Sequence, residues 1–168
     1  MEKIYWATLT HQEWPIILAA TEKGLCFVGS LKSDLGELKK WQLKRLPNAN
    51  LEENAKKMSP YLESFCRYFN EGQANISCPL DLYGTAFQQK VWAALADIPF
   101  GQTSTYGEIA NCIQQPKAVR AVGGAIGANP VAIVIPCHRV IGKDGSLTGF
   151  RGGLEMKKRL LKIERIAF

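Results

Sequence analysis

Residues 105–127 read TYGEIANCIQQPKAVRAVGGAIG, and this stretch decides how the second half of the chain folds. Thr105, followed three residues later by Glu108, forms a capping box that predicts the start of a short helix. Pro116 predicts the start of a second helix, which runs to about Gly127. Two helices joined by a short turn are typical of a helix-turn-helix, although many such pairs only pack a core.

The second of these helices is unusual because it consists largely of small residues. Glycine costs a helix interior about 1 kcal/mol relative to alanine, so the adjacent Gly123 and Gly124 require a physical reason. One reason is tight packing against a neighbouring element. The other is close approach of a ligand such as DNA. A helix is about 10–12 Å across with its side chains and the minor groove of B-DNA is only about 6 Å wide, so only a helix face of small residues can press into a widened minor groove. On the residues alone, packing is the favoured reading of these glycines.

A hydrophobic run, VAIVI at residues 131–135, predicts a buried strand that leads into PCHRV at residues 136–140. A cysteine in such a place is usually an inert core residue. Beside a histidine and near an arginine, however, the Cys137 thiolate is favoured, and the thiolate is the nucleophile. A final helix is expected from about residue 154 to 164, and most of its lysines are expected on a solvated face. Its Glu164 is either a surface charge or the carboxylate that orients His138.

The first half of the chain predicts a sheet with helices and shows no evident chemistry. Alternating apolar residues between positions 4 and 28 predict an antiparallel β-meander. Residues 33–34 cap one helix, residues 59–60 start a second, and residues 76–82 predict an edge strand containing a proline. A capping box at residues 85–88 then opens the first helix of the second half.

The net charge of +6 lies entirely in the second half of the 168-residue chain. Residues 1–84 carry 10 basic and 10 acidic side chains, whereas residues 85–168 carry 11 basic and 5 acidic ones. Such asymmetry is expected of a protein that meets a polyanion, but it is also compatible with an ordinary solvated face.

Composition and cysteine usage exclude several classes of protein. At 46% hydrophobic and 21% charged residues the chain is of ordinary globular type. Its longest apolar run is far below the roughly 18 residues of a membrane span, and the N-terminus resembles no secretion signal. Five scattered cysteines favour a reducing, cytoplasmic compartment over a disulfide framework, and they lack zinc-ligand spacing.

The motif IPCHRV at residues 135–140 resembles the active-site signature of the O6-alkylguanine-DNA alkyltransferases, also called methylated-DNA–protein-cysteine methyltransferases. Four further motifs stand in the family's order and spacing: YGE at 106–108, KAVRAVG at 117–123, NP at 129–130 and GGL at 152–154. The strong resemblance covers about residues 84–165. It implies an α/β N-terminal domain over residues 1–80, with an antiparallel sheet and helices. It also implies a mainly α, winged-helix-like helix-turn-helix domain over residues 84–168.

The resemblance further implies what this site does. Cys137 would take a methyl or other alkyl group directly from O6 of guanine, and from O4 of thymine, in a single turnover. His138, oriented by Glu164, would act through a water as the base, and Tyr106 would donate a proton or hydrogen bond to guanine N3. The implied residues for DNA and the flipped base are Arg120, Ala121, Gly123, Gly124, Asn129, Val140, Arg151 and Lys157.

Double-stranded DNA is the implied partner, bound through the minor groove with little sequence specificity. A monomer is expected, with no cofactor, no metal ion and no membrane. Arg151 and Phe150 depart from the small residue and the tyrosine that are common in the family. A long arginine either narrows the pocket for large alkyl groups or adds a phosphate contact.

Two other functions are compatible with parts of the sequence. A cysteine hydrolase would use Cys137, His138 and Glu164 with many turnovers, but it leaves the glycine-rich helix and the basic half unexplained. A binding module that recognises alkylated DNA without repairing it would need no cysteine at position 137.

Overall fold

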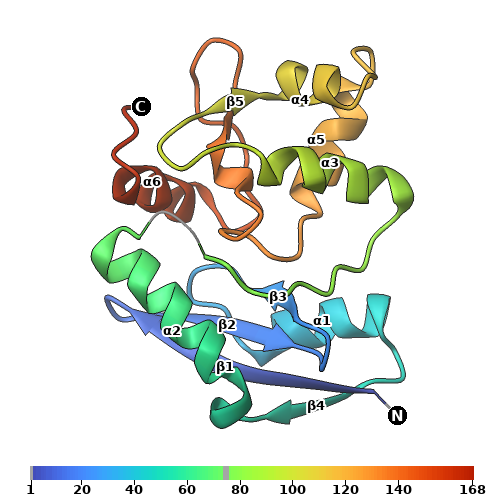
Figure 1. The fold of residues 1–168 in the computed structure, drawn as a ribbon, viewed down its shortest axis with the longest axis vertical. Helices are drawn as coiled ribbons and strands as arrows, with labels where there is room; N and C mark the ends of the chain where they lie inside the picture. Colours follow the sequence, from blue (N-terminus) through green and yellow to red (C-terminus); the bar gives the residue numbers. More distant parts are fainter. Residues whose placement is uncertain (1, 74–75) are drawn as a thin grey trace. The chain divides into compact units, whose positions relative to one another are not determined.

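The computed structural model describes residues 2–73 and 76–168, and the chain divides into two compact units, residues 1–83 and 84–168. The first unit contains β1 (Lys3–His11), β2 (Trp14–Ala20), β3 (Leu25–Val28), α1 (Leu35–Arg45), β4 (Asn50–Glu53) and α2 (Ala55–Glu71). The second contains α3 (Ala86–Ala96), β5 (Ser104–Thr105), α4 (Tyr106–Cys112), α5 (Val119–Gly127), the 3-10 helix η1 (Cys137–Arg139), β6 (Val140–Ile141) and α6 (Leu154–Ile163) (Figure 1).

The first unit is built on a four-stranded sheet in the order β3-β2-β1-β4. The first three strands pair antiparallel, as the alternating sequence predicts. β4 pairs parallel to β1, with Ile4 opposite Leu51. The sequence analysis did not predict β4, because its four residues, NLEE, include a single apolar side chain.

The sheet is covered on both faces because both sets of alternating side chains in β2 are apolar. Ile17 and Ala19 lie in a core cluster with Leu38 of α1. Helix α2 crosses β1 and β2 in front of the sheet in Figure 1 and buries Met58 and Phe65. The predicted α/β class of this unit is therefore confirmed.

Helix α2 begins earlier than the Ser59–Pro60 pair predicted. Its N-cap is Asn54, whose side chain accepts a hydrogen bond from the Lys57 amide. Pro60 lies inside the helix, where its missing N–H would leave the carbonyl of Lys56 unpaired. The Ser59 hydroxyl donates to that carbonyl at 3.0 Å instead. Ser59 therefore satisfies the carbonyl that Pro60 leaves unpaired, and both residues lie inside the helix and not at its start.

The edge strand predicted over residues 76–82 does not form. Only Leu80 pairs, as an isolated bridge to Leu25. The Leu25 amide donates to Pro79 O at 2.8 Å, and the Asp81 amide donates to Leu25 O at 2.9 Å. Pro79 cannot donate to a ladder, so pairing stops after these two bonds.

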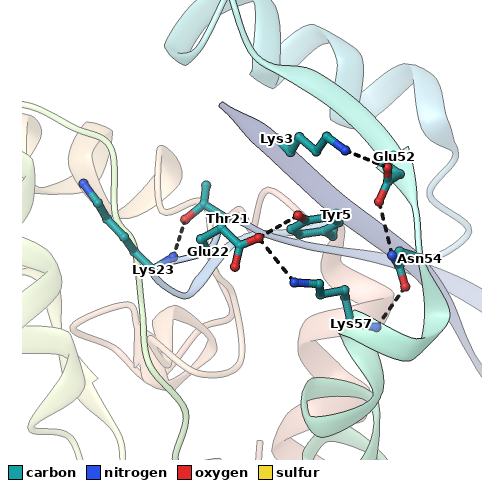
Figure 2. Close-up of polar contacts among 8 residues, drawn as sticks. All are labelled: Lys3, Tyr5, Thr21, Glu22, Lys23, Glu52, Asn54 and Lys57. Atoms are coloured by element: carbon teal, nitrogen blue, oxygen red, sulfur yellow. Dashed lines mark hydrogen bonds and ion pairs between the residues drawn. The ribbon is translucent and has the colours of Figure 1, made fainter. Parts of the chain in front are cut away.

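A group of polar contacts joins β1, β4 and the start of α2 in the first unit (Figure 2). Tyr5 donates to Glu22 at 2.6 Å, and Lys57 lies 3.3 Å from the same carboxylate. Lys3 pairs with Glu52 at 3.2 Å. The charged side chains are largely solvent-exposed, so these pairs contribute little to stability.

The second unit contains the predicted helix pair, α4 and α5, packed with α3. The predicted capping box at the start of α3 is present in full, and Thr105 caps α4. Helix α5 begins at Val119, three residues later than Pro116 predicted. The turn between the helices contains no glycine, and Gln114 adopts the left-handed conformation itself, with φ of 61°.

Two short strands and α6 complete the second unit. β5 pairs parallel to β6, with Ser104 opposite Val140. Helix α6 buries Met156, Leu160 and Leu161, whereas Leu154, the first residue of the helix, is 45% exposed. No helix within residues 2–73 and 76–168 has the length and apolar character needed to cross a bilayer.

Candidate active site and DNA-binding face

The hydrophobic run before Cys137 is a tight loop and not the strand that the sequence predicted. Ile133 has a φ of 79°, and the Ile135 amide donates to Val131 O at 3.0 Å. The loop folds around Asn129, which is 1% exposed. Its Nδ2 donates to Ile135 O at 2.8 Å, and its Oδ1 accepts from the Val131 amide at 3.0 Å. An amide side chain thus supplies the partners that a neighbouring strand would have supplied.

Cys137 opens the 3-10 helix η1 and is 6% exposed. Burial raises the pKa of its thiol, and this effect is opposed by a hydrogen bond from Asn129 and by the charges of Arg151 and Lys157. The thiol is therefore protonated at neutral pH, and the expectation that the neighbouring histidine and arginine favour the thiolate is wrong, because burial outweighs them and Arg139 is bound to Glu164. Use of the thiol as a nucleophile requires a base.

His138 is the next residue of η1, and its imidazole is completely buried. Its Nε2 hydrogen bonds Oε2 of Glu164, the residue that caps the C-terminus of α6. Burial lowers the pKa of His138, against the opposing influence of the Glu164 carboxylate. The ring is therefore neutral at pH 7.

The second ring nitrogen of His138 is the basic one. A neutral imidazole that donates Nε2–H to Glu164 keeps its lone pair on Nδ1. This atom is buried and has no hydrogen-bond partner within the described part of the chain, so it does not bond the Cys137 sulfur directly. The hydrogen bond between His138 and Glu164 is the contact that the sequence analysis expected, and passage of a proton from the thiol through a water stays a prediction.

Arg139 is a member of this site that the sequence analysis did not assign. Its Nε donates to Oε1 of Glu164 at 2.8 Å and its Nη2 to Oε2 at 3.2 Å, while its Nη1 donates to Ile98 O at 2.6 Å. The Gly101 amide also donates to Oε1 of Glu164, at 3.1 Å. The sequence signal was present, because an arginine directly after the Cys–His pair is the natural partner of a buried carboxylate.

Lys157 is 1% exposed, which contradicts the expectation that it lies on a solvated face of α6. Its Nζ donates to Val140 O at 2.6 Å and lies 3.5 Å from Thr148 O. Burial lowers the pKa of Lys157, and the nearby Cys137 opposes this. Two carbonyl groups that face inward therefore compensate for burying the ammonium group. The contact to Val140 also brings together two residues that the resemblance implies for the base pocket.

Tyr106, the first residue of α4, lies next to the loop between β6 and α6. Its hydroxyl is 2.5 Å from Oγ1 of Thr148. The residue also lines an open pocket with Val119 and Lys143. Arg151, in the same loop as Thr148, donates from Nε to Asn129 O at 3.2 Å.

The two adjacent glycines of α5 are not explained by packing. Val122, Ala125 and Ile126 are buried, and the Ala125 carbonyl accepts from the Trp92 indole at 2.8 Å. A Cβ placed on Gly124 would meet nothing within 4 Å, and one on Gly123 would make only ordinary contact with the Tyr106 ring, at 3.8 Å. The second reading of these glycines, close approach of a ligand, is therefore favoured.

The exposed side of α5 carries Arg120 and Ala121 next to this open surface. The predicted site residues thus lie in two places, a buried cluster around Cys137 and an exposed face of α5. Cys137, His138 and Glu164 form a buried cluster with Asn129 and Lys157, while Arg120, Ala121 and Gly124 lie on an exposed helix face. Among the described residues, no group of three or more histidine, cysteine and acidic side chains is placed to bind a metal ion.

Comparison with protein families identifies both units. Residues 86–166 match the DNA-binding domain of 6-O-methylguanine DNA methyltransferase, and residues 4–82 match its ribonuclease-like domain. The chain is 51% identical over 164 residues to the inducible methylated-DNA–protein-cysteine methyltransferase of Bacillus subtilis, covering 98% of this chain and 92% of the relative. It is 43% identical over 163 residues to the enzyme of the same name from Methanosarcina mazei, covering 96% and 97%.

Solved structures give the same result. The crystal structure of Mycobacterium tuberculosis OGT in complex with DNA matches with a TM-score of 0.78 and 36% identity, over 96% of this chain and 92% of that one. The O6-methylguanine-DNA methyltransferase of Pyrococcus kodakaraensis matches with a TM-score of 0.74 and 28% identity, over 97% and 99% of the two chains. The two-unit fold of this chain is therefore shared with solved proteins over almost its whole length.

Proposed function

The chain belongs to the 6-O-methylguanine DNA methyltransferase family, and on this premise we propose that it repairs DNA by moving alkyl groups onto its own Cys137. The substrates are O6-alkylguanine and O4-alkylthymine in double-stranded DNA. One observation carries the proposal: the buried Cys137 shares a 3-10 turn with His138, whose Nε2 is bound by Glu164.

The reaction begins with loss of the thiol proton. Burial keeps Cys137 protonated, so Nδ1 of His138 receives the proton through one bridging water. The sulfur then forms a bond to the alkyl carbon, and the bond between that carbon and guanine O6 breaks. Its electron pair stays on the guanine, where a hydrogen bond from Tyr106 to N3 stabilises the negative charge.

The product on the protein is a thioether. Neither His138 nor any other group placed in this site supplies a nucleophile or a reductant that would remove the alkyl group. Each molecule therefore acts once, and the expected amount of repair equals the amount of protein.

The damaged nucleotide has to leave the duplex before it can react, because an O6 atom inside a stacked helix cannot reach a buried thiol. The exposed face of α5 suits this task. Ala121 and Gly124 permit close approach of the backbone to a minor groove, and Arg120 is long enough to enter the space that the nucleotide leaves. Contacts of this kind discriminate little between DNA sequences.

The extruded base is held by main-chain groups beside Cys137. The Val140 carbonyl and the Arg151 amide are the proposed partners of the guanine edge. Lys157 fixes the Val140 carbonyl at 2.6 Å, and Asn129 shapes the loop before Cys137. The Arg151 side chain extends toward Asn129 O, so only its backbone is assigned to the base.

The test is a titration of the protein with a duplex that carries radiolabelled O6-methylguanine. Label should move to the protein and reach a plateau of one per active molecule, and Cys137→Ala should abolish the transfer. Release of label into solution would support a cysteine hydrolase. Binding of the duplex without any transfer would support a non-catalytic module.

A further inference from the structure

The hydroxyl groups of Tyr106 and Thr148 are in hydrogen-bond contact at 2.5 Å, although the residues are 42 positions apart. Tyr106 begins α4, and Thr148 lies in the loop between β6 and α6. Both side chains are partly buried. The function proposed above assigns Tyr106 to guanine N3 but assigns nothing to the side chain of Thr148.

The position of Thr148 is fixed independently of Tyr106. Its carbonyl lies 3.5 Å from Nζ of Lys157, which also binds Val140 O. On the preceding side, the Gly142 amide donates to Ser146 O at 2.8 Å and closes the turn that leads to Thr148. The threonine hydroxyl is therefore presented to Tyr106 by a backbone that other contacts hold.

We propose that Thr148 is a positioning residue for Tyr106 during alkyl transfer, an inference that rests on the proposed function. A phenol carries one proton and keeps lone pairs that can accept. When Tyr106 donates its proton to guanine N3, its oxygen is free to accept, and the Thr148 hydroxyl is the donor at hand.

This hydrogen bond has two effects on the reaction. It fixes the torsion of the phenol O–H, so that the proton points at the base. It also polarises the phenol, because a hydroxyl oxygen that accepts a hydrogen bond becomes a stronger donor. Tyr106 therefore stabilises the departing guanine better with Thr148 present than without it.

Thr148 could instead oppose the reaction by competing with guanine N3 for the Tyr106 proton, and this role predicts a different result. If its hydroxyl only occupies the Tyr106 proton in the free protein, it competes with guanine N3, and removing it should accelerate transfer. The Thr148 hydroxyl can rotate from acceptor to donor without displacement of the loop, which favours cooperation over competition.

The experiment measures the single-turnover rate of methyl transfer from duplex O6-methylguanine in four variants: Thr148→Val, Thr148→Ser, Tyr106→Phe and the Thr148→Val, Tyr106→Phe double variant. Thr148→Val keeps the shape without the hydroxyl and should be about tenfold slower, the effect of one hydrogen bond. Thr148→Ser should return the rate to within about twofold of the wild type. In the Tyr106→Phe background, Thr148→Val should have no effect.

Ser146→Ala is the matched control, because it removes an exposed hydroxyl from the same loop and should leave the rate unchanged. Urea unfolding of each variant separates a loss of folding from a loss of positioning, and Thr148→Ala replaces Thr148→Val if the valine variant is unfolded. Protein is kept in excess for hours, so that slow variants are still measured.

The outcomes separate this inference from the proposed function. If the wild type places no methyl group on Cys137, the proposed function itself fails. If the wild type reacts but Thr148→Val is as fast or faster, the positioning role is overturned. It is also overturned if serine gives no rescue, or if Thr148→Val slows the Tyr106→Phe protein as much as the wild type.

Discussion

Arg139 donates to both carboxylate oxygens of Glu164, the side chain that also binds Nε2 of His138. The carboxylate receives a further hydrogen bond from the Gly101 amide. A buried carboxylate with so many donors is held in one place, and the imidazole that binds it is held in turn. The orientation of His138, the proposed general base, therefore depends on Arg139, a residue with no role assigned in DNA binding.

Replacing Arg139 tests this dependence. Arg139→Met leaves the Glu164 carboxylate buried without its main partner, so the free energy of unfolding should fall by about 3–5 kcal/mol in urea titrations. Methyl transfer should slow by about tenfold or more, because His138 loses its fixed orientation. Arg139→Lys keeps the charge but loses the two-pronged contact, and should be intermediate in both measurements. Unchanged stability and rate in both variants would contradict the assignment.

The pH dependence follows from the buried imidazole. Burial lowers the pKa of His138 below its ordinary value of 6.5, so the neutral base persists in the folded protein at pH 6.5. The rate of transfer should stay level from pH 7.5 down to about 6.5 and fall only at lower pH. A midpoint of this fall above pH 6.5 would show that the ring is not shielded as described.

Stability should also fall with pH, but the fall should begin at a higher pH than the fall in rate, because it starts where His138 of the unfolded chain takes up a proton. Below about pH 6.5 the unfolded chain binds a proton at His138 that the folded protein does not, so unfolding takes up protons and the free energy of unfolding decreases as the pH falls. The loss continues until the pH reaches the lowered pKa of the folded state. His138→Gln removes the titrating group and should flatten this part of the stability profile, which urea titrations at several pH values can measure.

The open surface of α5 gives a prediction that separates folding from DNA binding. Gly124 has no neighbour within 4 Å of a built Cβ, so Gly124→Ala should raise the free energy of unfolding by about 0.5–1 kcal/mol through helix propensity. Gly124→Leu should also fold, but it should weaken binding to duplex DNA, because a long side chain separates the helix from the groove. Reaction with free O6-methylguanine base should be unaffected in both. If Gly124→Leu binds duplex normally, α5 does not approach the DNA closely.

Arg120 is expected to act only where a stacked duplex has to be opened. Arg120→Ala should slow repair in duplex DNA more than reaction with the free alkylated base, because the base alone needs no extrusion. Lys117→Ala, which removes a neighbouring exposed charge of the same sign, is the matched control for general electrostatic attraction. Equal losses on both substrates in Arg120→Ala would remove Arg120 from the role assigned to it.

Local signals in the sequence predicted most of the helices and the buried cluster of Cys137, His138 and Glu164. The caps at Asp34 and Thr105 and the capping box at Thr85 predicted helix starts that the structure confirms. The chemistry of a cysteine next to a histidine, with a glutamate late in the chain, led to the group that the structure brings together. These predictions succeeded because each rests on neighbouring residues or on one kind of side-chain chemistry.

The errors arose where a particular hydrogen bond changes what a segment can do, and such a bond is not evident from composition or periodicity. The apolar run before Cys137 became a loop because Asn129 supplies its hydrogen bonds, which composition does not reveal. Lys157 is buried because Val140 O and Thr148 O turn toward it. Pro60 fits inside α2 because the neighbouring serine satisfies the carbonyl that proline leaves unpaired.

The central claim is that the Cys137 sulfur receives the alkyl group and keeps it. The most direct measurement is mass spectrometry of the intact protein and of its peptides after reaction with an excess of duplex that carries O6-methylguanine. The account predicts one added methyl group per molecule, located on Cys137 and still present after prolonged incubation. A methyl group on another residue, or a Cys137 that returns to the free thiol while methanol accumulates, would contradict it.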